Sequence, residues 1–258
     1  MKQLAAWLCL LLAAPLAAEQ GEYQLGAGIL LTSQPHYLGA AQAKNLVLPV
    51  PFFSYKSERL TIDRQGATGF LADGDGWQLN VSLAGALPVD SKDNLLRQGM
   101  PSLDWVGEIG PALDVGLSDS WTLRLPLRQA IAGDLRHQQA IGQRFEPELR
   151  YNRSLNEELQ WQMTTSLAWN SRQYHQYFYG VSAEYSTDDR SAYQAKAGFS
   201  GFRFSNGLIY QRENWWLGIY ARYDYLGEAV YADSPLFGRK HQFSSGLVLV
   251  RIFQQSHN

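Results

Sequence analysis

Cysteine is nearly absent from this sequence of 258 residues, because the only one is Cys9, inside an apolar run near the N-terminus. That run follows Lys2 and ends in a Leu-Ala-Ala triplet before Glu19, which is typical of a secretory signal peptide over residues 1–18. Removing these 18 residues leaves a mature chain of 240 without a thiol. Disulfides and cysteine-ligated metal are therefore excluded from the mature chain, and it suits an oxidising compartment.

The sequence also lacks a strong charge and a long apolar segment beyond its leader. The formal net charge is −2 for the whole chain, which is too mild to indicate a nucleic-acid partner. After the leader no apolar run reaches about 18 residues, so no membrane-spanning helix is expected. The mean hydropathy of −0.28 would suit a soluble protein, but strands of a membrane barrel alternate in polarity and average to similar values.

What the sequence does contain is an apolar–polar alternation with a period of two. It recurs in residues 77–84, 121–128, 145–152 and 217–225, and its longest run is 159–170. Successive side chains of a strand point to opposite faces, so each segment has one apolar and one polar face. The longest run suffices to cross a bilayer as a tilted strand, since about 9–11 residues are needed.

A secreted soluble β-sandwich is the alternative, because its strands also alternate. Several segments here are longer than the five or six residues usual in globular sheets. Trp77, Trp121, Trp169, Trp215 and Tyr225 lie near segment ends, which is typical of the aromatic girdles of membrane barrels. Short polar turns and longer loops also differ in length, as expected of the two ends of such a barrel. We therefore predict an all-β fold, an antiparallel transmembrane β-barrel of one domain over residues 19–258.

The alternation predicts about twelve strands, and the same pattern also accommodates ten or fourteen. An even number places both termini in the periplasm, with extracellular loops near 33–44, 88–102 and 227–240. The predicted strands are 22–32, 45–55, 58–64, 76–87, 103–117, 120–132, 143–154, 158–170, 176–185, 199–210, 214–226 and 241–253.

Two local features bear on strand pairing. Pro49 and Pro51 each remove a ladder donor from the second strand, so we expect the sheet to be interrupted or bent there. The last strand ends in Phe253, as barrels of the outer membrane commonly end in an aromatic residue. Its phase is ambiguous, because Val248, Val250 and Ile252 are apolar while Arg251 interrupts the alternate positions.

Charged residues on the polar faces of these strands are predicted to line the barrel interior. Positive and negative charges occur in comparable numbers, which favours a lumen filled by ion pairs over a conducting channel, since a selective pore clusters one sign. The candidate lumen-lining residues are Arg124, Arg128, Glu146, Glu148, Arg150, Glu184, Arg222 and Asp224.

Other sites are not supported by the sequence. The five histidines, His36, His137, His175, His241 and His257, never occur at metal-ligand spacing. The Asp-Gly-Asp-Gly segment at 73–76 lacks the later acidic ligands of a calcium loop, so a turn is favoured. Gly26 and Gly28 lack the third glycine and the helix of a nucleotide fingerprint, and small residues in a crowded wall explain them better. Without a G-x-S-x-G elbow, no enzyme and no cofactor are predicted.

Several ordered segments resemble the MipA/OmpV family of outer-membrane proteins. They span nearly the whole mature chain, and the Ser-Pro pair before the closing strand makes the combination fairly specific. The family usually has an aromatic residue two positions before the final Phe, where this chain has Arg251. The segments are Gly26-Ala27-Gly28, Pro35-His36-Tyr37-Leu38-Gly39, Leu48-Pro49-Val50-Pro51-Phe52-Phe53-Ser54-Tyr55, Tyr179-Gly180-Val181-Ser182, Tyr193 with Ala195 and Gly198, Tyr225-Leu226-Gly227, and Asp233-Ser234-Pro235.

The resemblance implies an outer-membrane barrel in contact with lipid, exported through the cleaved signal peptide of a Gram-negative cell. It further implies a scaffold that links a murein lytic transglycosylase, a peptidoglycan hydrolase, to a penicillin-binding protein that synthesises peptidoglycan. A small porin for hydrophilic solutes and a surface adhesin are the alternatives. The family provides no catalytic residues to transfer to this chain.

Overall fold

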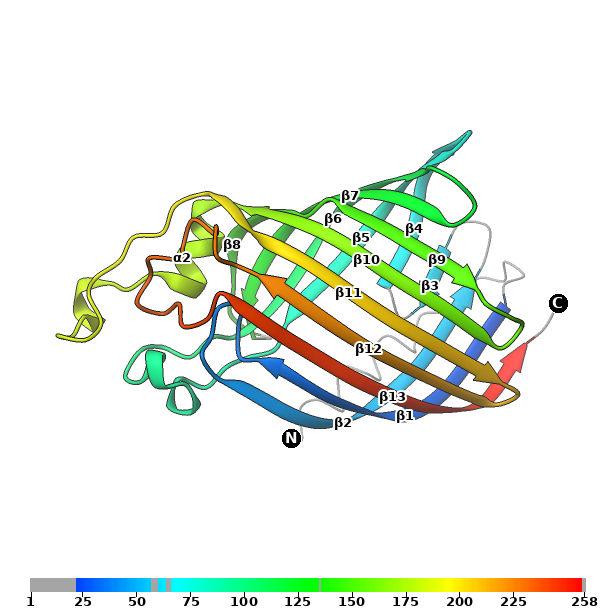
Figure 1. The fold of residues 1–258 in the computed structure, drawn as a ribbon, viewed down its shortest axis with the longest axis horizontal. Coiled ribbons are helices and arrows are strands. Elements are labelled where there is room, and N and C mark those ends of the chain that lie inside the picture. The colour runs from blue at the N-terminus through cyan, green and yellow to red at the C-terminus, as the bar shows by residue number, and fades with distance from the viewer. Residues whose placement is uncertain (1–21, 57–59, 64–65, 135, 257–258) are drawn as a thin grey trace.

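The computed structural model describes residues 22–56, 60–63, 66–134 and 136–256, and the predicted signal peptide lies outside them. The chain forms one antiparallel sheet that closes on itself as a barrel (Figure 1). The strands are β1 (Glu22–Pro35), β2 (Ala43–Lys56), β3 (Leu60–Asp63), β4 (Gly66–Gly74), β5 (Trp77–Ala86), β6 (Trp105–Gly116), β7 (Trp121–Gly133), β8 (Gln138–Phe145), β9 (Glu148–Ser154), β10 (Leu159–Asn170), β11 (Gly198–Arg212), β12 (Trp215–Tyr225) and β13 (His241–Ser256).

Two of these segments, β8 and β9, occupy one position in the wall. Both pair with β7 and with β10, and only residues 146–147 separate them. Pro147 has no N–H to donate, which explains the break in the ladder. The wall among the described residues therefore has twelve strand positions, and the pairing of β10 with β11 belongs to its closed ring. The predicted barrel and its twelve strands are confirmed.

The predicted strand at 176–185 is wrong. Residues 172–179 form helix α2 (Arg172–Tyr179), which Ser171 caps by accepting a hydrogen bond from Tyr174 N. Tyr174 and Phe178 lie one helical turn apart and are both buried, so the aromatic spacing follows a helical period rather than a period of two. The count of twelve still agrees, because the glycine-rich segment β4 forms a strand that the alternation did not predict.

The two ends of the barrel differ. Residues 117–120, 155–158 and 213–214 make tight turns at the end where β1 begins and β13 finishes (Figure 1). Residues 36–42, 87–104, 171–197 and 226–240 make the longer connections at the other end, and α2 lies among them. The length difference is typical of the periplasmic and extracellular ends of an outer-membrane barrel, so we use these names for the two ends.

The outer face of the wall is apolar. Val47, Leu31, Leu247 and Ile219 lie in one cross-strand row of β2, β1, β13 and β12, and all four are exposed. Aromatic residues flank this band, with Trp215 toward the periplasmic end and Tyr223, next to Phe243, toward the extracellular end. Among the described residues, no helix is both long and apolar enough to cross a membrane.

The pairing of β2 tests the prediction made for Pro49 and Pro51. Strand β2 pairs with β1 along its whole length, but its pairing with β3 covers only Tyr55 with Ile62 and Lys56 with Thr61. The predicted interruption near Pro49 and Pro51 is therefore confirmed on one side of the strand, where an edge tolerates proline.

In β13 the alternation continues to the end of the wall. Phe253 shares the outer face with Leu247 and Leu249, whereas Val250 and Ile252 are buried inside the barrel. Arg251 also lies on the outer face, 5.1 Å from the centre of the Trp215 ring at the periplasmic girdle. An arginine at this level keeps its charge close to the polar boundary of a bilayer, so it does not shift the strand register.

Candidate functional site

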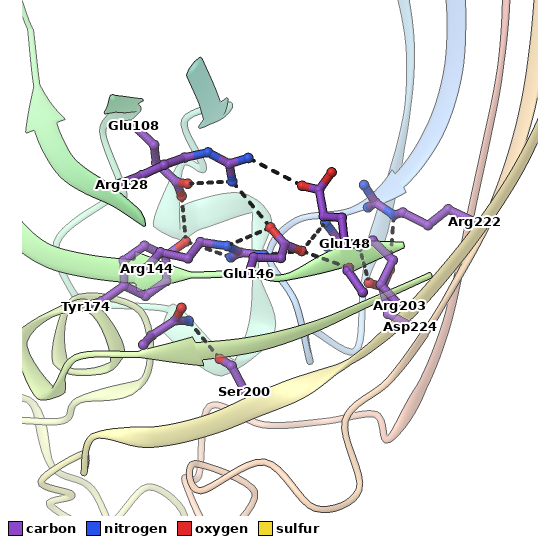
Figure 2. Close-up of polar contacts among 12 residues, drawn as sticks. Glu108, Arg128, Arg144, Glu146, Glu148, Tyr174, Ser200, Arg203, Arg222 and Asp224 are labelled. Carbon is purple, nitrogen blue, oxygen red and sulfur yellow. Dashed lines mark hydrogen bonds and ion pairs between the residues drawn. The ribbon is translucent and has the colours of Figure 1, made fainter. Parts of the chain in front are cut away.

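A layer of ion pairs fills the middle of the barrel, with Glu146 at its centre (Figure 2). Arg144 Nη2 donates to this carboxylate at 2.9 Å and Arg203 Nη1 at 3.2 Å. Arg128 Nη1 lies 3.4 Å from it, and Ser166 Oγ donates at 3.2 Å. Glu146 is only 5% exposed, so these donors are what make a buried negative charge tolerable.

Two further carboxylates extend the layer across the interior. Asp224 accepts from Arg203 Nε at 2.7 Å, and its other oxygen lies 3.0 Å from Arg222 Nε. Glu148 lies 3.4 Å from Arg128 Nη2. These pairs join strands β7, β9, β11 and β12, so the layer connects separate parts of the wall (Figure 2).

Charges of both signs nearly balance in this layer. Six arginines pair with five carboxylates, which matches a filled lumen rather than a constriction of one sign. The set, called the charged layer below, consists of Glu108, Asp114, Arg124, Arg128, Arg144, Glu146, Glu148, Arg150, Arg203, Arg222 and Asp224.

Seven of the eight residues predicted to line the lumen lie in the charged layer. The exception is Glu184, which is exposed on the short 3-10 helix η3 (Ala183–Tyr185) in the loop after α2. The predicted strand at 176–185 put Glu184 in the lumen, but these residues form the end of α2 and a loop. The seven that the structure brings together are Arg124, Arg128, Glu146, Glu148, Arg150, Arg222 and Asp224.

Four members of the charged layer were missed by the prediction: Glu108, Asp114, Arg144 and Arg203. A signal for them was present, because Glu108 and Asp114 share one phase of β6 and Arg144 shares the phase of Glu146. Arg203 is directly opposite Asp224 in the register of β11 and β12. The inward phase of the predicted strands therefore indicates these charged residues as well.

An apolar cluster fills the interior nearer the periplasmic end. Phe52, Trp216, Val250 and Ile252 are all buried there, and the rings of Phe52 and Trp216 lie 6.1 Å apart. Gly28 makes room for this cluster, because a Cβ at that position would lie 2.7 Å from the Val250 side chain. This crowding confirms that Gly28 serves wall packing. We call these four residues the apolar cluster.

A cap closes the extracellular end. It consists of α2 and residues 36–42 and 226–240, which pack together around a core of aromatic rings. Tyr179 and Tyr231 stack with ring centres 3.7 Å apart, and Tyr231 Oη donates to Ser200 O on β11 at 2.7 Å. Burial raises the pKa of Tyr37 to about 12, so its hydroxyl stays protonated and donates to Leu236 O.

The cap is hydrogen-bonded to both the wall and the charged layer. Arg144 Nη1 donates to Tyr174 Oη at 3.2 Å, and this hydroxyl donates to Glu108 Oε1 at 3.0 Å (Figure 2). Burial raises the pKa of Tyr174, which keeps that proton in place. Helix α2 is therefore held against the interior by a charged pair on either side of one phenol.

The buried His175 forms the second connection. Its Nδ1 lies 2.6 Å from Lys196 O, which can only accept, so Nε2 is left to accept from Ser200 Oγ at 2.8 Å. Burial lowers the pKa of His175, which favours the neutral ring that this arrangement needs. Asn170 Nδ2 donates to the same hydroxyl, and neither Ser200 nor His175 is more than 3% exposed. This serine and this histidine hold α2 to β11.

A cavity of about 220 Å³ separates the charged layer from the cap. Arg144, Glu146 and Arg203 line it from the layer, and Tyr174 and Phe178 line it from the cap. Within the described ranges, no group of three His, Asp or Glu side chains could hold a metal ion. Every carboxylate of the charged layer faces an arginine instead. The Asp-Gly-Asp-Gly segment at 73–76 is exposed and consists of the last two residues of β4 and the two-residue turn into β5.

The sequence model of one family, described as MltA-interacting protein MipA, matches residues 25–253. A solved structure of the COG4313 outer membrane channel from Pseudomonas putida F1 aligns with a TM-score of 0.46 and 11% identity, over 92% of this chain and 97% of that one. The outer membrane protein OprG from Pseudomonas aeruginosa aligns with a TM-score of 0.26 and 11% identity, over 92% and 97%. No curated protein matches the sequence.

Proposed function

Because the chain belongs to the MltA-interacting protein MipA family of outer-membrane β-barrels, we propose that it is a scaffold for peptidoglycan remodelling. In this proposal residues 1–18 direct export and are then cleaved off. The mature chain is inserted in the outer membrane of a Gram-negative cell. Its periplasmic end then binds a lytic transglycosylase of the MltA type, the partner named in the family description. A penicillin-binding protein would join the same assembly as the synthase.

The filled interior is the observation that carries the proposal. A porin needs a continuous polar path, but here the charged layer lies across the middle and the apolar cluster lies below it. The cap adds a third barrier on the extracellular side. These three barriers support a binding role at the barrel surface over the small-porin alternative. The adhesin alternative concerns the extracellular loops and stays a prediction.

The periplasmic turns supply a surface for such binding. Five acidic residues in or beside these turns are exposed. Among the described residues, the exposed arginines at this end are Arg153, Arg212 and Arg251, and Arg212 is paired with Glu158. We expect this acidic rim to contact a basic patch of the enzyme, with an attraction that weakens as salt is added. The residues of the acidic rim are Asp73, Asp75, Asp119, Glu157 and Glu213.

The test is direct binding of the purified lytic transglycosylase of the same cell to the barrel in lipid nanodiscs. Neutralising the acidic rim with Asn and Gln should weaken binding at least tenfold. A matched variant neutralises acidic residues at the other end, Glu184, Asp188 and Asp189, and should bind like the wild type. No binding by the wild-type barrel, or equal loss in both variants, would overturn the proposal.

A further inference from the structure

The barrel wall has an opening at its side, between β2 and β5. The hairpin of β3 and β4 should connect these strands, but β3 has four residues and β4 has nine. In the described part of the chain, β2 has no partner on that side before Tyr55, and the pairing of β4 with β5 stops at Phe70 with Asn80. Among the described residues, therefore, 43–54 of β2 and 81–86 of β5 form edges with no neighbouring strand. We call the gap between these two edges the side opening.

The side opening lies at the level of the membrane hydrocarbon. Val47 on its β2 edge is 70% exposed and continues the outer row of Leu31, Leu247 and Ile219. Pro51, further along the same edge, lies in the row of Ala27 and Arg251, which is the periplasmic girdle. The open edge thus spans the apolar band from the girdle upward, so its outer neighbour is the lipid chain region.

Small and apolar side chains line the opening on its inner side. Ser82 points inward, since it accepts from Arg128 Nε, and Ala84 and Ala86 share its phase on β5. Both alanines are nevertheless exposed, because no wall covers them on the β2 side. On β2 the inward positions are Leu46, Leu48 and Val50, which are half-buried. A hydrocarbon chain between these edges would contact mainly the apolar side chains of Ala84, Leu46 and Leu48, while Ser82 stays bonded to Arg128.

The opening leads into the interior cavity. Ala84 and Ala86 belong to the lining of that cavity, together with Glu108 and Arg128 of the charged layer. Above the opening, Lys44 Nζ donates to Pro88 O at 3.1 Å, so the loop after β5 is joined to the start of β2. The cap closes the extracellular direction and the apolar cluster the periplasmic one. The side is the remaining approach.

The charge of the cavity lining indicates what it would accept. Four arginines line it, Arg128, Arg144, Arg203 and Arg222, against two carboxylates, Glu108 and Glu146. Although these arginines are paired within the charged layer, two of their carboxylate partners, Glu148 and Asp224, lie outside the lining. The surface facing the cavity is therefore positive, and it attracts an anion.

We propose that the side opening admits a single-chain anionic amphiphile, a fatty acid, from the membrane. The hydrocarbon chain lies between β2 and β5, and the carboxylate lies in the cavity near the arginines of the charged layer. This binding site is independent of the proposed scaffold, whose surface is at the periplasmic turns. The barrel is then closed along its axis but open from the side.

The test uses dodecanoic acid with a photoreactive diazirine at the chain end and the full barrel in lipid nanodiscs. After illumination, peptide mapping should find label on inward positions of the opening, Leu48 and Ala84. Substituting A84W fills the opening and should reduce this label at least tenfold. The matched control is L83W, one position away on the outer face, which should leave the label unchanged. Heat-modifiable electrophoretic mobility confirms that both variants fold.

Three outcomes would overturn the proposal. Label confined to outward residues such as Val47, and equal in both variants, would show only bilayer contact. Equal labelling by a photoreactive dodecyl trimethylammonium probe would refute the preference for an anion. In a separate chemical cross-linking experiment, links that join two chains through β2 would assign the edges to a second copy. If A84W fails to fold, L48W on the opposite edge takes its place, with the same expected loss. Failure of this test leaves the transglycosylase binding assay unaffected.

Discussion

The charged layer and the apolar cluster fill the same barrel at neighbouring levels by different physical means. In the layer each side chain depends on partners of opposite charge, and Glu146 alone contacts three arginines. In the cluster Phe52, Trp216, Val250 and Ile252 depend on shape and on removal from water. We therefore expect that deleting a charged side chain of the layer leaves its charged partners unsatisfied, whereas deleting the Val250 or Ile252 side chain of the cluster leaves a cavity.

The largest expected effect is the loss of the central carboxylate. Substituting E146A leaves the buried Arg144 without its carboxylate partner and removes one of the two carboxylates that Arg203 contacts, which costs about 3–5 kcal/mol of unfolding free energy. Urea unfolding in lipid vesicles, followed by tryptophan fluorescence, measures it. The exposed turn substitution E157Q is the control and should change stability by less than about 0.5 kcal/mol. A loss for E146A as small as that control would mean that the layer is not needed to hold the barrel together.

A packing change in the apolar cluster should cost less. V250A removes buried methyl groups and leaves a cavity, so we expect a loss of about 2 kcal/mol in the same urea experiment. L249A on the adjacent, outward position is the matched control, because its side chain faces lipid and is 43% exposed. If the inner and outer variants lost equal stability, the cluster would not be a packed core.

The cap should make stability depend on pH through His175. Its pKa is lowered in the folded chain, so below pH of about 6.5 the unfolded chain takes up a proton that the folded one refuses. Above that pH the contribution is constant. As pH falls from there toward the lowered value, the unfolding free energy decreases by up to about 1.4 kcal/mol per unit. Comparing urea midpoints at pH 7.5 and 5.5 with those of H175Q isolates this share. An identical pH dependence in both proteins would contradict the neutral, enclosed ring.

The smallest effect concerns one hydrogen bond of the cap. Y231F keeps the ring that stacks on Tyr179 and removes the hydroxyl that donates to Ser200 O. We expect the unfolding free energy to fall by about 1 kcal/mol, and by more if the Ser200 carbonyl is left without a donor. Hydrogen exchange of residues 198–201 should rise in parallel. Unchanged stability and exchange would show that stacking alone holds this part of the cap.

The sequence predicts the strands of the barrel wall better than the residues that fill the barrel. The period of two located β10 and β12 because lipid on one side and the charged layer on the other impose it. The period of two fails in segments that face neither lipid nor the charged layer. Helix α2 packs on other loops, so its aromatic spacing follows a helix, and β4 is too rich in glycine to show alternation.

The candidate site was predictable only in part. Phase alone placed Arg128 and Glu146 inside, and the same rule applied to Glu108 would have added it. What phase cannot provide is the partner across the barrel, because the approach of Arg203 to Glu146 depends on how the sheet closes. The cap and the side opening depend on loop packing and on a short hairpin, for which the sequence has no periodic signal.

Planar-bilayer recording of the purified barrel is the most direct test of the central claim that the interior is closed along its axis. In 1 M potassium chloride the wild type should show no reproducible conductance steps, because the charged layer and the apolar cluster both block the path. The double variant E146A/W216A, which weakens both barriers, should show openings. Stable, uniform conductance steps from the wild-type barrel would contradict the account.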